Sequence, residues 1–208
     1  MTHTLHRRSE HKVEGEDFTI LCMAAQGYNE QGAGEKLKEI YKLVASTAPD
    51  NLADDNLGGR FTGHTDTEIL DHMGDKAYIG AAFKDRARLK AALEKIKAAD
   101  LGMSVVVTGK HEAVFQVLKE IDIQPHTVNM SLGFFGKKEK VPKEEILAVS
   151  TMCGHGMVPK QRIEHMIEDV RQQKCSAKEG GEKLASACTC GIFNPKLASE
   201  ILDSLAKT

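Results

Sequence analysis

Apolar positions follow two alternating spacings over the first two thirds of the chain. Continuous apolar runs of strand length lie at residues 18–25, 77–83 and 103–108, a pattern typical of strands that are buried on both faces. A fourth strand is predicted at residues 126–132. These four segments are the expected members of one sheet.

Stretches with apolar residues at helical spacing separate the predicted strands. Helices are predicted at residues 85–99 and 111–121, and another follows the glycine-rich loop at residues 26–34. Asp66 is the expected N-cap of a short helix that ends near Met73. Strands that alternate with helices through short connections predict an α/β fold, a layered sheet with right-handed crossovers.

The remainder of the chain is predicted to be helical. A charged stretch at residues 136–142 is the expected boundary, and Pro159 suits the first turn of a helix that follows it. We therefore expect a mobile N-terminal arm at residues 1–12, an α/β ligand-binding domain at 13–136 and a small helical subdomain at 137–208.

Two further helix starts in this subdomain have recognisable caps. Ser176 and Glu179 form a capping-box pattern, and Asn194 is followed by proline at the first helical position. The helix after Ser176 contains Gly180 and Gly181, each of which costs about 1 kcal/mol relative to alanine. Close packing or a bound ligand must therefore compensate at this pair.

Composition narrows the function classes. The 208 residues carry a net charge of −2, only 5% are aromatic and tryptophan is absent, so neither nucleic acid nor an anionic membrane is an expected partner. The polar N-terminal residues lack the apolar segment of a secretory signal, which predicts a cytoplasmic protein. Five cysteines in that compartment argue against a disulfide framework.

Two short thiol-rich loops near the C-terminus are the main candidates for chemistry. The first carries Cys153 and His155 around Gly154, and the second carries Cys188 and Cys190. If the helices between them pack as an antiparallel pair, both loops reach the same end of the bundle. Three thiolates and an imidazole suit tetrahedral Zn²⁺, whereas three thiolates alone suit an iron–sulfur cluster with an open site.

We favour the [4Fe–4S] alternative, because glycines beside both loops let backbone N–H groups approach inorganic sulfur. Zinc with His155 as fourth ligand remains open, as do a redox or nucleophilic thiol pair and simple burial. Cys22 fits a small hydrophobe in a buried strand, and Cys175 precedes the Ser176 cap in a polar turn.

A ligand-binding edge is predicted at the ends of two strands. Glycine-rich turns followed by helices bind anions through backbone N–H groups, and parallel strands would bring two such turns to one edge. The predicted cofactor-binding residues are Gly27, Gly32, Gly34, Thr108 and Gly109. Lys110 and His111 are candidate catalytic groups there, with His155 at the metal. Arg60 and His64, in a long loop at residues 48–65, are further candidate substrate contacts.

These features predict a metal- or cluster-dependent enzyme, such as a lyase or oxidoreductase, that acts on a small substrate, for which an anion is a candidate. The alternatives are a non-catalytic metal sensor, carrier or assembly factor, and a zinc protein with a structural Cys₃His site. A concave pocket beside the metal is expected of the enzyme and not of the carrier. A homodimer is compatible with either.

Overall fold

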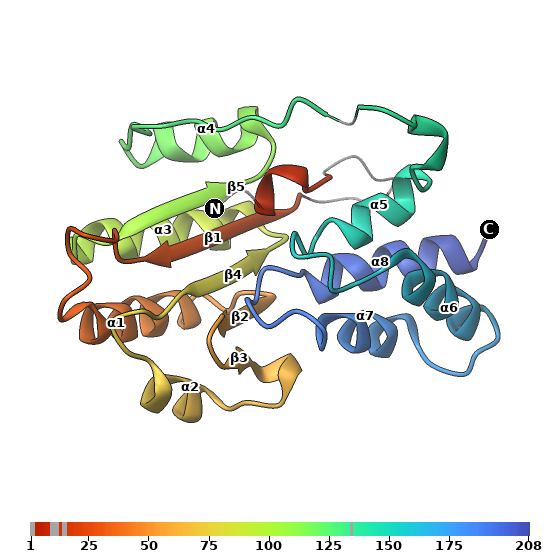
Figure 1. Ribbon diagram of the computed structural model, residues 1–208, viewed down its shortest axis with the longest axis horizontal. Coiled ribbons are helices and arrows are strands. Elements are labelled where there is room, and N and C mark those ends of the chain that lie inside the picture. The colour runs from red at the N-terminus through yellow and green to blue at the C-terminus, as the bar shows by residue number, and fades with distance from the viewer. Residues whose placement is uncertain (1–2, 9–12, 14–15, 134) are drawn as a thin grey trace.

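The computed structural model describes residues 3–8, 13, 16–133 and 135–208 (Figure 1). It has an α/β fold with a C-terminal helical part, as predicted. The strands are β1 (Phe18–Met23), β2 (Asn51–Asp54), β3 (Gly58–Gly59), β4 (Ile79–Phe83) and β5 (Ser104–Thr108). The α-helices are α1 (Ala33–Ala45), α2 (Asp66–His72), α3 (Arg86–Ala99), α4 (His111–Glu120), α5 (Glu144–Ser150), α6 (Lys160–Arg171), α7 (Ala177–Ala185) and α8 (Pro195–Ala206). Short 3₁₀ turns are η1 (His3–His6), η2 (Arg60–Thr62) and η3 (Lys138–Lys140).

The sheet has the strand order β3-β2-β4-β1-β5, and every neighbouring pair is antiparallel. Helix α1 connects β1 to β2, and α3 connects β4 to β5, so each crossover passes over one intervening strand. This is the split βαβ arrangement of ferredoxin-like folds. The shared ligand-binding edge required β1 and β5 to run parallel, and this condition is not met because each crossover joins strands that are not adjacent.

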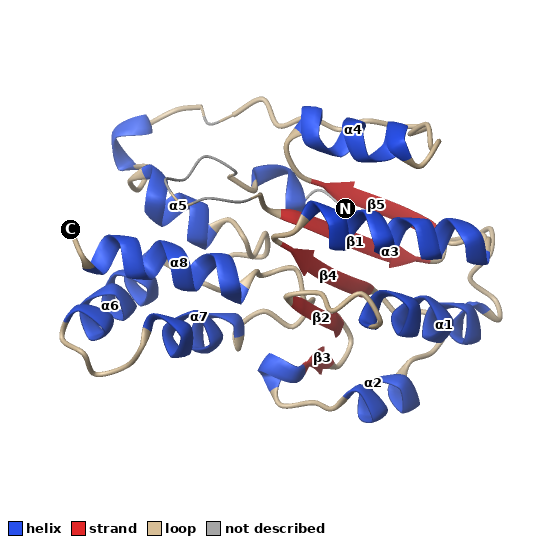
Figure 2. Cartoon of the chain, turned by 180° about the vertical axis from the view of Figure 1, so that it is seen from behind, coloured by secondary structure: helices blue, strands red, loops and turns tan. Residues whose placement is uncertain are grey.

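Two hydrophobic cores cover the two faces of the sheet. Alternate β1 residues, Phe18, Ile20 and Cys22, belong to the core formed with α1, α3 and α4. Leu21 and Met23 face the other way and belong to the core of the C-terminal helices. Figures 1 and 2 show α1 and α3 together on one face of the sheet. Helices α5–α8 lie together beyond one end of the strands. The C-terminal helices therefore share a core with the sheet.

Two of the helix starts are capped as predicted, and in one of them Asn194 accepts a hydrogen bond from the backbone N–H of Leu197. Asp85, which was expected to be the first residue of a helix, is instead the N-cap of α3 and accepts hydrogen bonds from the backbone N–H groups of Ala87 and Arg88. The Ser176 capping box is present as predicted. The N-cap of α2 is Thr65 rather than Asp66, and its hydroxyl accepts from the N–H of Glu68 in another capping box.

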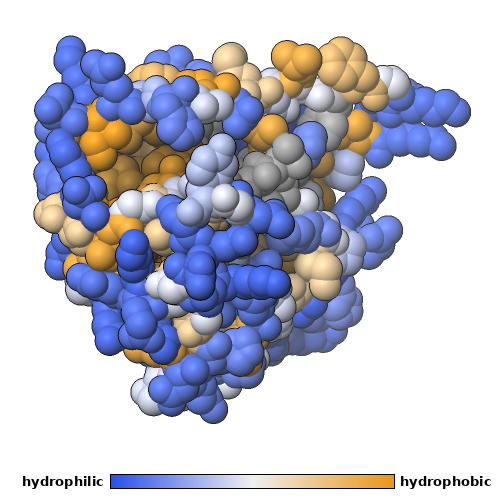
Figure 3. Space-filling model, turned by 60° about the vertical axis from the view of Figure 1, so that its left-hand side comes forward, coloured by the Kyte–Doolittle hydropathy of each residue, from blue (hydrophilic) through white to orange (hydrophobic). Residues whose placement is uncertain are grey.

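The predicted strand at residues 126–132 is absent: this described segment has no regular secondary structure. Its apolar side chains face solvent, with Met130 67% and Leu132 85% exposed. Figure 3 shows apolar surface along the upper part of the molecule and a mostly hydrophilic surface below it. The prediction is wrong because a strand also needs a paired neighbour, and within the described part of the chain no strand pairs with this segment.

Residues 48–65, expected to be a structureless loop, contain β2, β3 and η2. The segment is too polar and rich in glycine to show strand periodicity, but β2 pairs with β4 from Asn51 opposite Ala82 to Asp54 opposite Ile79. The loop prediction is therefore wrong for its central part. This edge of the sheet places Arg60 beside the C-terminal helices.

The described residues of the predicted N-terminal arm are docked. The Arg7 guanidinium forms a buried ion pair with Asp17 at 2.6 Å and donates to the carbonyl of Met152. The backbone N–H of Arg8 donates to the Thr151 hydroxyl at 3.0 Å. Residues 1–2 and 9–12 of the arm lie outside the described part of the chain.

Close packing compensates for the two glycines in α7. A Cβ atom on Gly181 would overlap the Ser199 hydroxyl and the carbonyl oxygen of Pro195, both in α8. A Cβ atom on Gly180 would lie 3.1 Å from side-chain atoms of Leu202 and Met166. The glycine pair thus lets α7 approach α8, and packing rather than a ligand accounts for it.

Candidate metal centre

The two thiol-rich loops converge on one buried site. The sulfur atoms of Cys188 and Cys190 are 3.6 Å apart, and the Cys190 sulfur is 3.8 Å from Nδ1 of His155. Cys153 is hydrogen-bonded to Cys188. Each of the three cysteines is only 2% exposed, whereas His155 lies at the surface. His155 of the first loop thus lies against Cys190 of the second, and binding of a metal by the whole set stays a prediction.

Backbone N–H groups near the three sulfur atoms act to lower the pKa values of the thiols. Those of Met157 and His155 act on Cys153, that of Phe193 acts on Cys188, and that of Ile192 acts on Cys190. Hydrogen bonds from such groups stabilise a thiolate, because a charged acceptor strengthens a hydrogen bond. The turns that carry the cysteines therefore supply the donors that a cluster of negative sulfur atoms requires.

The pKa values of the three thiols differ in direction: they are raised at Cys153 and Cys188 and lowered at Cys190. Donation to Cys188 is the main cause that raises the pKa of Cys153, and burial adds to it. Donation from Cys153 lowers the pKa of Cys188, but its bond to Cys190 and burial outweigh this and raise it to about 12. Donation from Cys188 lowers the pKa of Cys190 against the opposing effect of burial. Cys190 is thus the sulfur that carries negative charge first.

The four groups touch in a series rather than as a closed tetrahedron. Among the described residues, no three side chains of His, Cys, Asp or Glu already form a ready-made ligand set for a metal ion. The contacts run from Cys153 through Cys188 and Cys190 to His155. Cys153 and His155 flank Gly154 in the same short turn, so the first loop supplies both ends of this series.

The sheet holds the second thiol loop in place. A Cβ atom on Gly80, in β4, would overlap the carbonyl oxygen of Cys190, so the loop backbone lies directly on the sheet. The side-chain amide of Asn51 in β2 donates to the carbonyl of Phe193 at 2.9 Å. Asn194 then caps α8. The position of Cys188 and Cys190 is therefore set by strands far away in the sequence.

The predicted ligand edge does not exist. Strand β1 is antiparallel to β5, with Thr19 opposite Thr108 and Met23 opposite Ser104. The loop that contains Gly27, Gly32 and Gly34 follows Met23, whereas Thr108 and Gly109 lie at the other end of the strands. The two turns lie at opposite ends of the β1–β5 pair, so the prediction of one shared anion site is wrong.

The glycine-rich turn does bind an anion, but one from the same chain. The backbone N–H groups of Gly32 and Gly34 donate to the carboxylate of Asp75 at 2.9 and 2.8 Å. These bonds lower the pKa of Asp75. Asp75 therefore occupies the N-terminus of α1 that the sequence assigned to a ligand.

The other predicted catalytic groups are not assembled with the thiols. His111 begins α4, as predicted, and its ring packs edge-on against Phe115 of the same helix at 5.3 Å between ring centroids. Lys110 is exposed at the N-cap position. Of the proposed catalytic residues, only His155 lies at the thiol site.

The remaining cysteines are separate from this site. Cys22 is fully buried in the core on the opposite face of the sheet from Cys153, Cys188 and Cys190. Cys175 is half-buried, and its thiol donates to the sulfur of Met166 at 3.8 Å. Cys22 is therefore the small buried hydrophobe that its sequence context indicates.

Cys22 should make the fold sensitive to alkaline pH. Burial raises its pKa from 9.0 to about 12, so above pH 9 the thiol ionises in the unfolded chain while the folded chain keeps its proton. Stability is then lost as pH rises, by about 1.4 kcal/mol at pH 10 from this group. Urea unfolding of the wild type and of Cys22→Ala between pH 8 and 10 should show the extra decline only in the wild type; parallel curves would contradict it.

A cavity of about 750 Å³ lies at the junction of the sheet with α7 and α8. Its lining includes Arg60, which sequence reasoning had singled out, together with Phe61 and Lys178, which it had not. No cysteine or histidine is among the lining residues, so the cavity does not open onto the thiol site.

Among the described residues, no helix combines the length and hydrophobicity needed to cross a bilayer. Comparisons of this chain with family models, with curated proteins and with solved structures find no match.

Proposed function

We propose that this protein binds a single soft metal ion, zinc in the first place, through Cys153, Cys188, Cys190 and His155. The observation that carries the proposal is the spacing of the ligand atoms, 3.6 Å between Cys188 and Cys190 and 3.8 Å between Cys190 and His155. Ligands of a tetrahedral zinc ion, with Zn–S of about 2.3 Å, lie roughly 3.7 Å apart. Cysteines on different irons of a cubane lie about 6 Å or more apart, which disfavours the [4Fe–4S] cluster that the glycines had suggested.

The burial of the thiols supports a structural ion. Each cysteine is 2% exposed, and the loop of Cys188 and Cys190 lies on β4 and β2. An ion bound there would tie the turn after α5 and the turn after α7 to each other and to the sheet. The bonds to the ion would add stability that a small helical unit does not obtain from its own hydrophobic core.

The position of the cavity favours this role over substrate activation. A metal-dependent enzyme needs room for substrate beside its ion, and the cavity of about 750 Å³ at the junction has no thiol in its lining. The solvent-facing His155 leaves one side of the site accessible, so exchange of ions with the surroundings is compatible with the geometry. A carrier or sensor of metal ions is thus the nearest alternative to a purely structural centre. All five cysteines are free, which supports a reducing compartment such as the cytoplasm.

Metal content of the purified protein tests the proposal. Protein prepared without oxygen should be colourless and hold about one zinc ion per chain. Replacement of Cys153, Cys188 or Cys190 by serine should strip the ion, because each removes one of four ligands. Cys175→Ser is the matched control and should keep it, because Cys175 contacts Met166 instead. Full metal content in Cys153→Ala, or brown protein with several irons per chain, would overturn the single-ion site.

A thiol redox pair is the second candidate, supported by the 3.6 Å separation of Cys188 and Cys190. Oxidation would join the two sulfur atoms and release two protons and two electrons to an external disulfide. The intact mass of air-exposed protein distinguishes the candidates. Loss of two hydrogens that a reductant restores, in protein without metal, would favour the redox pair.

A further inference from the structure

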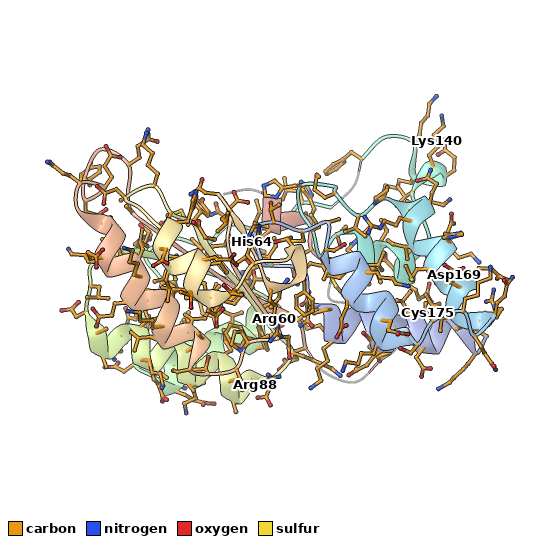
Figure 4. All side chains as sticks on the ribbon, turned by 90° about the horizontal axis from the view of Figure 1, so that it is seen from below. Arg60, His64, Arg88, Lys140, Asp169 and Cys175 are labelled. Carbon is orange, nitrogen blue, oxygen red and sulfur yellow. The ribbon has the colours of Figure 1, made fainter. Side chains whose placement is uncertain are left out.

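The cavity at the junction of sheet and helices has the size of a small-molecule site. Its volume of about 750 Å³ falls within the roughly 300–1,000 Å³ that ligand pockets occupy. One wall comes from the end of α1, from β2 and from η2, and the facing wall comes from α7 and α8. Figure 4 shows Arg60 and Arg88 at this junction, between the helices of the sheet half and the C-terminal helices.

Part of the charge in the lining is already neutralised. Asp50 is buried and pairs with Arg88 at 3.0 Å, and it also accepts from the backbone N–H of Lys84 at 2.6 Å. Glu200 pairs with the ammonium group of Lys84. These groups stabilise the junction itself, so they are not the ones that a ligand would engage.

Three cations in the lining are left for a ligand. Arg60, Lys178 and Lys196 are exposed, and none of them has an ion-pair partner among the residues that the structure describes. The remaining acids of the lining are Asp66, which accepts a hydrogen bond from Tyr41, and Glu182. The lining holds four cations and four acids, but Asp50 is paired with Arg88 and Glu200 with Lys84, which lies outside the lining. The three remaining cations therefore face two remaining acids, and this local net charge of +1 favours a ligand with a negatively charged group.

An aromatic surface lies beside these cations. The guanidinium carbon of Arg60 is 4.8 Å from the ring centroid of Phe61, and the same guanidinium donates to the carbonyl of Asp50 at 3.3 Å. Leu52 and Pro195 add apolar surface to the lining. A flat apolar group could pack against Phe61 or the face of the guanidinium while an attached anion reaches the lysines.

From these contacts we infer that the cavity is a binding site for a small organic anion with a flat apolar body. The body lies between Phe61 and Pro195, and the anionic group lies among Arg60, Lys178 and Lys196. The site is independent of the metal centre, because the two share no lining residue or ligand. Binding would bridge η2 to α7 and α8, and so would stabilise the junction of the two halves.

Fluorescence titration with 1-naphthyl phosphate tests the inference on the full-length protein as purified. The probe should bind saturably at one site per chain, and its uncharged analogue 1-naphthol should bind at least about tenfold more weakly, because it lacks the charge-assisted contacts. The variant with Arg60→Met, Lys178→Met and Lys196→Met together should lose at least about tenfold in affinity for the phosphate.

Lys183→Met is the matched control, since Lys183 is an exposed lysine of the same helix α7 that does not line the cavity. It should bind the probe as the wild type does. Thermal melting of each variant confirms that it is folded. The inference is overturned if the phosphate shows no saturable binding up to millimolar concentration, if 1-naphthol binds equally well, or if the triple variant and Lys183→Met behave alike.

Discussion

Replacement of Gly80 by alanine should destabilise the fold by about 3 kcal/mol, the upper part of the range for inserting atoms into a packed core. The new Cβ atom would overlap the carbonyl oxygen of Cys190 and lie 3.0 Å from its carbonyl carbon. Both are backbone atoms, so no side chain can rotate away. Either β4 leaves its register with β1 and β2, or the thiol loop lifts off the sheet. Urea unfolding monitored by circular dichroism gives the free energy of unfolding.

Gly74→Ala provides the matched control for this experiment. A Cβ atom at Gly74 meets nothing within 4 Å, and its backbone is not in the left-handed region. Alanine there should be neutral or stabilising by up to about 1 kcal/mol, because it restricts the unfolded chain. If Gly80→Ala and Gly74→Ala unfold at the same urea concentration, the close contact between β4 and Cys190 does not exist in solution.

The same Gly80 contact illustrates what a sequence can and cannot predict. The caps at Ser176 and Asn194 were predictable because each side chain bonds to a backbone N–H in the first turn of its helix. Gly80 looks like any small residue of a buried strand. Glycine is required at this position because of a loop more than a hundred positions away in the printed sequence. No local pattern in the sequence predicts that contact.

The glycine-rich turn after β1 shows the same limit at a candidate site. Its N–H groups were correctly expected to bind an anion, since they begin a helix. The anion is Asp75, which lies 41 residues after Gly34. Sequence reasoning identified the donors and could not identify the acceptor, because the position of α2 and the turn after it depends on the whole sheet. The antiparallel pairing of β1 with β5 could not be predicted for the same reason.

The thiol site was more predictable because its ligands lie close together within each loop. Cys153 and His155 are two residues apart, and so are Cys188 and Cys190. Only the meeting of two loops had to be inferred, and helices of similar length between them made it plausible. The distances between the ligand atoms, which decide between one ion and a cluster, required the structure.

Removal of the metal should loosen the C-terminal helices and leave the sheet intact. At a free zinc concentration a thousand times its dissociation constant, the ion stabilises the folded state by about 4.1 kcal/mol. Without it, the two turns lose the bonds that joined them, and the buried Cys188 thiol, with its pKa raised to about 12, keeps its proton. The turns at residues 153–158 and 188–193 should then open first, because the ion is what joins them.

Hydrogen exchange measured by mass spectrometry, with and without a chelator, follows this opening region by region. Amides of residues 150–195 should exchange at least about tenfold faster in the metal-free protein, which corresponds to about 1.4 kcal/mol of lost protection. Amides of β1 and β4 should change little, since they are held by the sheet and by the core with α1 and α3. Cys188→Ser should resemble the metal-free protein whether or not zinc is added, whereas Cys175→Ser should respond like the wild type. Equal exchange in every region, with and without the ion, would mean that the thiol site does not hold the two halves together.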